Sequence, residues 1–261
     1  MQILLEGASV SRSFGGVRAL DGVDFHLARG EVLGVIGPNG SGKTTLIDLI
    51  SGSLQPSAGE IRFRGGIISR LPAHRIARLG IARSFQVSRA FLGMTVEENI
   101  LVGALFGSPS AATSRRDRAR DVGAILEFLG LGGRRSHRVR ILSVTDRKKV
   151  DLGRALAMNP QVLLLDELMA GLPPGDTEEM MAVIREIRRR GVSLVIIEHV
   201  MNVIVSLCSR VLVLHQGRKI ADGPARDIMR DREVLRAYLG AAFTEEVLDR
   251  GVPASGQGSG S

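Results

Sequence analysis

The stretch from residue 37 to residue 45 constrains the fold of this chain most strongly. It matches the pattern G-x-x-x-x-G-K-[ST] without a gap, and it lies between an apolar run at 32–36 and residues of helical spacing at 46–50. In such a loop, glycines let successive backbone N–H groups face one anion, and the lysine adds a positive charge. The sequence therefore predicts a phosphate-binding loop between a buried strand and a helix, formed by Gly37, Pro38, Asn39, Gly40, Ser41, Gly42, Lys43, Thr44 and Thr45.

Length and composition favour a globular α/β protein. The chain has 261 residues, of which 44% are hydrophobic and 24% charged, and its longest apolar runs are too short to span a bilayer. The first residues lack the pattern of a secretory signal, and the single cysteine, Cys208, excludes an internal disulfide. We therefore expect a protein of the reducing cytosol.

The net charge of +8 raises the question of an anionic partner. Arginines cluster at 115–120 and 134–140, but aromatic residues make up only 3% of the chain and none lies between these arginines. Stacking on single-stranded nucleic acid is therefore poorly supported. A solvated face is the simpler interpretation, and contact with acidic lipid headgroups is the alternative.

The N-terminal half predicts strands on both sides of the loop. Residues 3–31 and 57–63 have the pattern of antiparallel strands, with turns expected at Gly15-Gly16 and Asp21-Gly22. Residues 71–79 have helical spacing and 81–86 are extended. Residues 87–156 are the least strand-like and predict a helical subdomain, including a helix that starts with a capping box at Thr95 and Glu98.

The C-terminal half returns to alternating strands and helices. Strands are predicted at 162–166 and 194–197, a hairpin at 210–221, and a last helix from Pro224. The predicted fold class is α/β: a P-loop NTPase core of the RecA-like type with a mixed or parallel sheet, an antiparallel β subdomain and an inserted α-helical subdomain. We expect one domain at 1–240 and an extension with a flexible tail at 241–261.

Two strand ends add chemistry to the loop. Asp166 and Glu167 end the apolar strand at 162–166, where Asp166 can hold Mg²⁺ together with Thr44, and Glu167 can orient or deprotonate a water beside the terminal phosphate. His199 ends the next strand and could donate a hydrogen bond to that phosphate. The other histidines have no such pattern and are interpreted as structural.

With these residues the chain resembles the ATP-binding subunit of ABC transporters, and most closely the subunits of branched-chain amino acid importers. The resemblance covers residues 3–240 and depends on Phe14-Gly15-Gly16, the loop at 37–45, Gln86, the signature region at 142–146, Asp166-Glu167, Ala170-Gly171-Leu172, Ile197-Glu198-His199 and Ala237-Tyr238-Leu239-Gly240.

The resemblance implies roles for further residues and partners. Phe14 would stack on adenine, and Gln86 would touch Mg²⁺ or water and sense the membrane subunit. Two such subunits would sandwich two ATP molecules between the loop of one and the signature residues Ser143 and Thr145 of the other. The implied partners are permease subunits, a second ATP-binding subunit of the same or another type, and indirectly a periplasmic binding protein, with no nucleic acid. The implied location is peripheral, on the cytoplasmic face of the inner membrane.

The chain departs from the family pattern at two positions. The signature has the form L-S-x-G followed by a polar residue, and here it reads Leu142-Ser143-Val144-Thr145-Asp146, with Thr145 in place of the glycine. A glycine there lets backbone N–H groups reach the partner's terminal phosphate, and a β-branched residue adds bulk at this point of closest approach. Losing one charge-assisted hydrogen bond to that phosphate costs about 1.5–3 kcal/mol, which predicts slowed rather than absent hydrolysis. Pro173 stands where Asp or Asn is usual, at an expected contact across the dimer.

Three functions remain open at this point. The leading one is an energy-coupling ATPase of an importer, with Glu167 as base. A soluble ABC protein of DNA repair or translation is a second, although the chain lacks paired ATPase domains and a long coiled-coil insertion. A nucleotide-responsive regulatory subunit, paired with an active paralogue, is the third. No residue of the chain identifies a transported substrate.

Overall fold

The computed structural model describes residues 2–84, 90–107 and 115–239. An antiparallel sheet contains β1 (Ile3–Phe14), β2 (Val17–Ala28), β4 (Ala58–Phe63) and β5 (Gly66–Ile67), in the order β2-β1-β4-β5. The predicted turn at Gly15-Gly16 joins β1 to β2. The turn predicted at Asp21-Gly22 is wrong, because both residues lie inside β2. The pairs Val10–Val23 and Arg12–Leu20 leave one extra residue in β2, and this bulge absorbs the glycine without ending the strand.

A six-stranded sheet forms the centre of the molecule. Its order is β10-β9-β3-β8-β7-β6, with bounds β3 (Val32–Ile36), β6 (Ile81–Arg83), β7 (Val162–Asp166), β8 (Ser193–Ile197), β9 (Arg210–His215) and β10 (Arg218–Pro224). Neighbouring strands pair in parallel except for the edge pair β9 and β10, which is the predicted hairpin. The α/β class and the mixed sheet are therefore confirmed.

Apolar side chains that point alternately to the two faces of the central sheet form two separate apolar layers. One face packs with α6 (Pro174–Arg189) and α7 (Met201–Leu207), and the other packs with α1 (Lys43–Ile50) and the antiparallel sheet. Because side chains of a strand point alternately to its two faces, the runs of buried residues serve both layers at once. The first face carries Leu163, Leu165, Leu194, Ile196, Val211 and Val213; the second carries Val162, Leu164, Val195, Ile197, Leu212 and Leu214.

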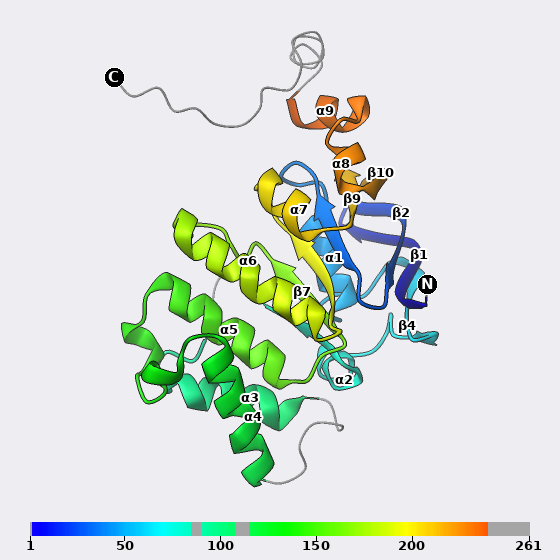
Figure 1. The fold of residues 1–261 in the computed structure, drawn as a ribbon. Coiled ribbons are helices and arrows are strands. Elements are labelled where there is room, and N and C mark those ends of the chain that lie inside the picture. Colours follow the sequence, from blue (N-terminus) through cyan, green and yellow to red (C-terminus); the bar gives the residue numbers. More distant parts are fainter. Residues whose placement is uncertain (1, 85–89, 108–114, 240–261) are drawn as a thin grey trace, which may run out of the picture.

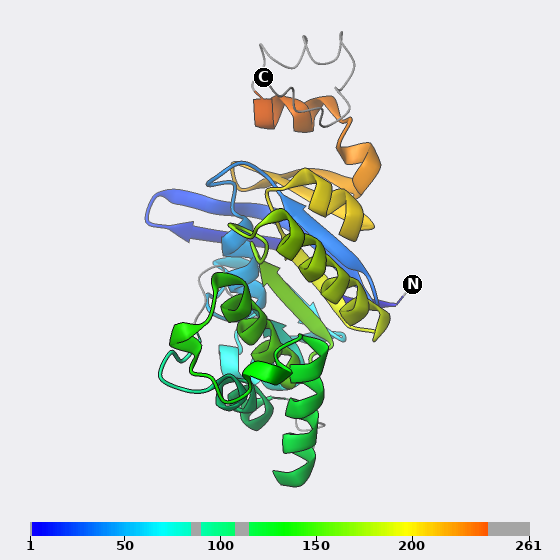
Figure 2. The same cartoon turned by 60° about the vertical axis from the view of Figure 1, so that its left-hand side comes forward.

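Helices gather at one end of the molecule, as Figures 1 and 2 show from two directions. They are α3 (Val96–Phe106), α4 (Arg115–Phe128) and α5 (Val144–Ala157), with short 3₁₀ turns at Gly132–Arg134 and Val139–Ile141. The capping box that the sequence predicts is present: the Thr95 hydroxyl accepts from the Glu98 amide, and the Glu98 carboxylate accepts from the Thr95 amide. The remaining helix of the N-terminal half is α2 (Ala73–Leu79).

The C-terminal region differs from the prediction in one respect. In place of one last helix it contains α8 (Ala225–Ile228) and α9 (Arg232–Leu239), which lie at the end of the molecule opposite α3–α5 (Figure 1). The Asp231 carboxylate accepts from the amides of Glu233 and Val234, and so starts a new helix. In the part of the chain that the structure describes, no helix is both long and apolar enough to cross a membrane.

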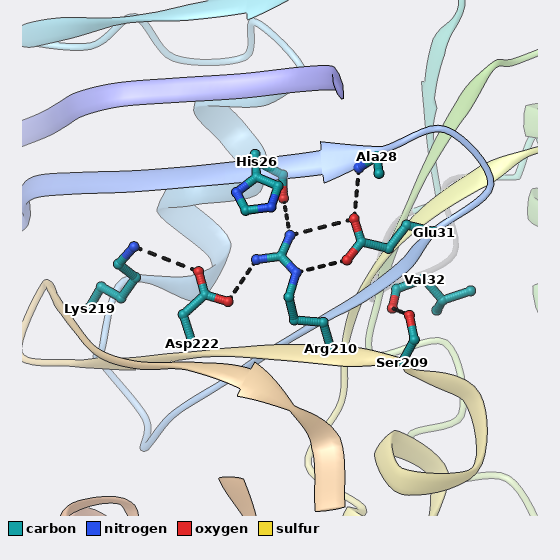
Figure 3. Close-up of polar contacts among 8 residues, drawn as sticks. All are labelled: His26, Ala28, Glu31, Val32, Ser209, Arg210, Lys219 and Asp222. Carbon is teal, nitrogen blue, oxygen red and sulfur yellow. Dashed lines mark hydrogen bonds and ion pairs between the residues drawn. The ribbon is translucent and has the colours of Figure 1, made fainter. Parts of the chain in front are cut away.

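Arg210 joins the two sheets (Figure 3). Its guanidinium forms ion pairs with Glu31 at 2.8 Å and with Asp222 at 2.6 Å, and it donates to the backbone carbonyl of His26 in β2. The other Glu31 oxygen accepts from the amide of Ala28 at the end of β2. One side chain of β9 therefore ties β2, the β2–β3 connection and β10 together.

Candidate nucleotide-binding site

The sheet register places the predicted site residues at one edge. Val35 of β3 and Asp166 of β7 both pair with Ile197 of β8, so these strands end at the same level. The loop after β3, Glu167 after β7 and His199 after β8 therefore follow adjacent parallel strands. Ligands of open α/β sheets bind at such carboxyl ends.

Two glycines are required by close approaches in the phosphate loop. A Cβ on Gly37 would lie 2.1 Å from the Leu214 carbonyl oxygen, and one on Gly42 would lie 2.5 Å from that of Ala19. Both have positive φ, +152° and +106°. Gly42 precedes α1, so the loop leads directly into the helix N-terminus, where backbone N–H groups favour an anion.

Lys43 lies inside the loop that it follows. Its Nζ donates to the carbonyls of Gly37 at 2.8 Å and Pro38 at 2.9 Å, and its side chain is buried. Burial lowers the pKa of Lys43, while the nearby carboxylates of Glu167 and Asp166 oppose that shift. The ammonium is thus held between the loop and the two acidic residues predicted from the sequence.

Asp166 has one oxygen available for a further ligand. Its Oδ2 accepts from Arg83 at 2.9 Å, and its Oδ1 is buried with no hydrogen-bond partner among the described residues. Burial raises the pKa of Asp166, and the Arg83 hydrogen bond opposes this shift. Mg²⁺ prefers hard oxygen ligands. The buried Asp166 oxygen and the hydroxyl of the exposed Thr44 are ligands of this kind, so these two residues fit Mg²⁺.

Glu167 and His199 contact each other directly. The Glu167 Oε1 and His199 Nε2 atoms lie 2.7 Å apart, with the glutamate side chain 15% exposed and the histidine 40% exposed. The Glu167 backbone has a φ of +49°, an uncommon conformation for a residue with a side chain. The structure therefore brings together Glu167 and His199, the base and the phosphate sensor that the sequence predicts at the ends of separate strands.

Phe14 lies at the tip of the β1–β2 hairpin and is 45% exposed. The guanidinium carbon of Arg12 lies 4.7 Å from its ring centroid, and β2 approaches the phosphate loop where Ala19 meets Gly42. An exposed aromatic ring backed by a cation on the same side of the molecule as the loop is suited to stack on a base.

The signature residues divide into exposed and buried ones. Ser143 is exposed and caps α5, accepting from the Asp146 amide at 3.1 Å, and Val144 is 60% exposed. Thr145 is only 9% exposed, and its hydroxyl donates to Asp176 of α6. The Thr145 side chain thus points into its own subunit, while Ser143 remains at the surface. Gln86 lies outside the described residues.

Sequence reasoning missed several charged residues around this site. Arg83 bridges Asp48 of α1 and Asp166, while Lys148 and Glu198 surround the turn after Glu167. Arg83 ends a short apolar strand, and Glu198 belongs to the Ile197-Glu198-His199 motif, but neither signal indicated a role in the site. The partners of these side chains are distant in sequence, so no local pattern identifies them.

The loop, the lysine and the acidic strand end define a P-loop nucleotide-binding protein. Comparison with protein families matches the ABC transporter model at residues 20–170 and the branched-chain amino acid ATP-binding cassette transporter model at 218–244. Among curated relatives, the high-affinity branched-chain amino acid transport ATP-binding protein BraF of Pseudomonas aeruginosa is 34% identical over 92% of this chain and 98% of its own. LivG of Escherichia coli K12, which has the same description, is 33% identical over 92% of this chain and 99% of its own.

Solved structures agree with these matches. An ATP-binding cassette of an ABC transporter in its ADP conformation superposes with a TM-score of 0.84 at 31% identity, covering 92% of this chain and all of the other. A nucleotide-free ATP-binding cassette from an ABC transporter superposes with a TM-score of 0.84 at 30% identity, with the same coverage of both chains. The chain belongs to the ATP-binding subunits of ABC transporters and is an ATPase of that family. These relatives favour a transporter subunit over a soluble, non-transport ABC protein.

Proposed function

We propose that this chain binds ATP with Mg²⁺ and hydrolyses it to power an importer of branched-chain or related amino acids. The contact between Glu167 and His199, next to Lys43 and Asp166, is the observation that carries the hydrolytic part. The printed descriptions of BraF and LivG support the substrate class. Residues 1–240 would form the ATP-binding domain, with the helices at 87–156 as a subdomain.

Each residue of the site has a defined task in this proposal. The amides of the phosphate loop and the Lys43 ammonium bind the phosphates, and Phe14 stacks on the adenine. Thr44 and Asp166 would hold Mg²⁺, which when bound neutralises charge on the phosphate oxygens. Glu167 accepts a proton from the attacking water through its carboxylate. His199 holds that carboxylate through Nε2 and can turn to donate to the terminal phosphate.

The proposal includes partners. A second ATP-binding subunit would place its signature, through Ser143, against the nucleotide on this phosphate loop. Permease subunits would contact the end formed by α3–α5, and a periplasmic binding protein would deliver the substrate to them. The exposed Ser143 at the start of α5 supports the first of these contacts. The subunit would be peripheral, on the cytoplasmic face of the membrane.

Replacing Glu167 by Gln tests the hydrolytic role. Removing the base should lower kcat at least 100-fold, because general-base catalysis contributes about 10²–10⁴-fold, while MgATP binding stays within about twofold. Single-turnover hydrolysis and binding of a fluorescent ATP analogue measure the two quantities. Glu233→Gln, an exposed glutamate of α9, is the matched control and should keep the original rate. A Glu167→Gln protein that hydrolyses ATP at the unaltered rate would refute the assignment.

A further inference from the structure

The turn that follows Glu167 is held by a buried lysine. Lys148 of α5 is 7% exposed, and its Nζ donates to the carbonyls of Glu167 at 3.3 Å, Leu168 at 2.8 Å and Ala170 at 2.8 Å. A lysine ammonium has three protons to donate, so these carbonyls satisfy it within the chain. One side chain therefore fixes the backbone on both sides of Leu168.

A buried glutamate holds the same turn from the other side. Glu198 is 2% exposed, and its Oε1 accepts from the Met169 amide at 2.8 Å. Burial lowers the pKa of Lys148 and raises that of Glu198, and in each case the opposite charge of the other residue opposes the shift. The ammonium and the carboxylate thus compensate each other around the 167–170 turn, where neither would be stable alone.

The backbone of this turn needs such support. Glu167 has a φ of +49°, and a residue with a side chain keeps this conformation only when its surroundings impose it. The carboxylate that this backbone carries lies 2.7 Å from His199 Nε2. A misplacement of about 1 Å in a catalytic group can cost about 100-fold in rate. The geometry of the turn therefore determines whether Glu167 can act.

Lys148 also belongs to the helix that presents the signature. Ser143 caps α5 and Lys148 lies just over a turn further along the same helix. A shift of α5, such as one caused by a phosphate bound at Ser143, would move the ammonium that holds the Glu167 turn. The helix thus provides a direct mechanical connection between the signature and the base of the same subunit.

We propose that Lys148 and Glu198 are positioning residues that hold the 167–170 turn, and that Lys148 couples the placement of Glu167 to the signature helix. This inference rests on the role of Glu167 in the proposed function. It assigns no contact with ATP to either residue, so their loss should affect turnover and leave nucleotide binding intact.

The test compares Lys148→Met with Lys149→Met in the full chain. Lys149 is the next residue of α5 and is equally buried, at 6%, but its Nζ pairs with the Glu179 side chain of α6 instead of the turn. We expect kcat to fall at least 10-fold in Lys148→Met, with KM and the affinity for a fluorescent ATP analogue within twofold. Lys149→Met should keep kcat within twofold. Equal losses of kcat in both variants, or an unaltered Lys148→Met, would overturn the inference.

A second pair of variants covers the case in which Lys148→Met does not fold. Glu198→Gln retains an oxygen that can accept from Met169, whereas Glu198→Leu does not. We expect kcat to be several-fold higher in the glutamine variant than in the leucine variant, again with similar affinity for the analogue. Equal rates in the two would contradict the role of Glu198. Failure of the Glu167→Gln prediction would refute the proposed function itself, whereas an inactive Glu167→Gln protein with unaltered Lys148 and Glu198 variants would refute only this inference.

Discussion

At the scale of single residues, Thr145 shows how an unusual side chain can fit a family framework. The family signature has a glycine here, and a threonine side chain raised the expectation of bulk facing the partner's phosphate loop. In the structure the side chain is buried and its hydroxyl donates to Asp176. The bulk is thus directed at α6, which makes the hydroxyl part of the contact between α5 and α6. Slowed hydrolysis stays a prediction, tested by the ATPase rate of Thr145→Gly.

Thr145→Val should destabilise the protein by about 1.5–3 kcal/mol, because it removes a hydrogen bond to a charged group and leaves the Asp176 oxygen without its donor. Thr145→Ser retains the hydroxyl and should lose less than half as much. Urea unfolding of the nucleotide-free chain measures both free energies. Equal stability of the valine and serine variants would show that the hydroxyl contributes nothing to this contact.

The sequence identified the residues of the site that lie at or just after the end of an apolar strand. The phosphate loop, Asp166-Glu167 and His199 each follow an apolar strand, so their position in the chain already indicates the edge of the sheet. The roles of Arg83, Lys148 and Glu198 were not predicted, because each side chain contacts a partner far along the chain. These partners include groups of the turn after Glu167 and of the helix α1. Tertiary packing sets the positions of the turn and the helix, so neighbouring residues in the sequence give no sign of these contacts.

At the scale of elements, capping residues predicted where helices start better than the composition of the segments did. The start of α3 was predicted from Thr95 and Glu98, and these two residues form the expected capping box. The short helix α7 had no capping signal: Val200 at its N-cap makes no side-chain hydrogen bond. The division of the last helix into α8 and α9 follows from Asp231, a cap that lies within a charged stretch and was therefore overlooked.

Thr95→Ala tests the importance of the capping box for α3. The substitution removes the acceptor of the Glu98 amide, and we expect a loss of about 1 kcal/mol in the free energy of unfolding, with faster amide hydrogen exchange in the first turn of α3. Thr177→Ala is the matched control, since that threonine lies inside the first turns of α6 and its hydroxyl donates to the Pro173 carbonyl. The same increase of exchange in α3 for both variants would contradict a local effect of the cap.

At the scale of the whole molecule, two sheets must keep a fixed relation for the site to form. Phe14 belongs to the antiparallel sheet, while the phosphate loop, Asp166 and His199 follow strands of the central sheet. In the proposed site the nucleotide would therefore contact both sheets at once. Near the loop they meet where the Gly217 carbonyl accepts from the Asp21 amide and the Gly217 amide donates to Ser41. At the start of β9 they meet through Arg210.

Arg210→Met tests whether the ion pairs of Figure 3 hold the two sheets together. The side chains of Arg210, Glu31 and Asp222 are 17%, 13% and 18% exposed. The substitution leaves the mostly buried Glu31 carboxylate without its cation and leaves Asp222 with only the longer ion pair to Lys219 at 3.6 Å. We expect a loss of about 3 kcal/mol in the free energy of unfolding, measured in urea. Arg218→Met is the control: Arg218 pairs with Asp21 between the same sheets but is 72% exposed, and its loss should cost less than about 1 kcal/mol. Because Arg210 begins β9, at the opposite end of the strand from the phosphate loop, the folded Arg210→Met protein should bind the ATP analogue with unaltered affinity. Equal destabilisation by the two substitutions would mean that burial of the Arg210 ion pairs contributes nothing to holding the sheets in place.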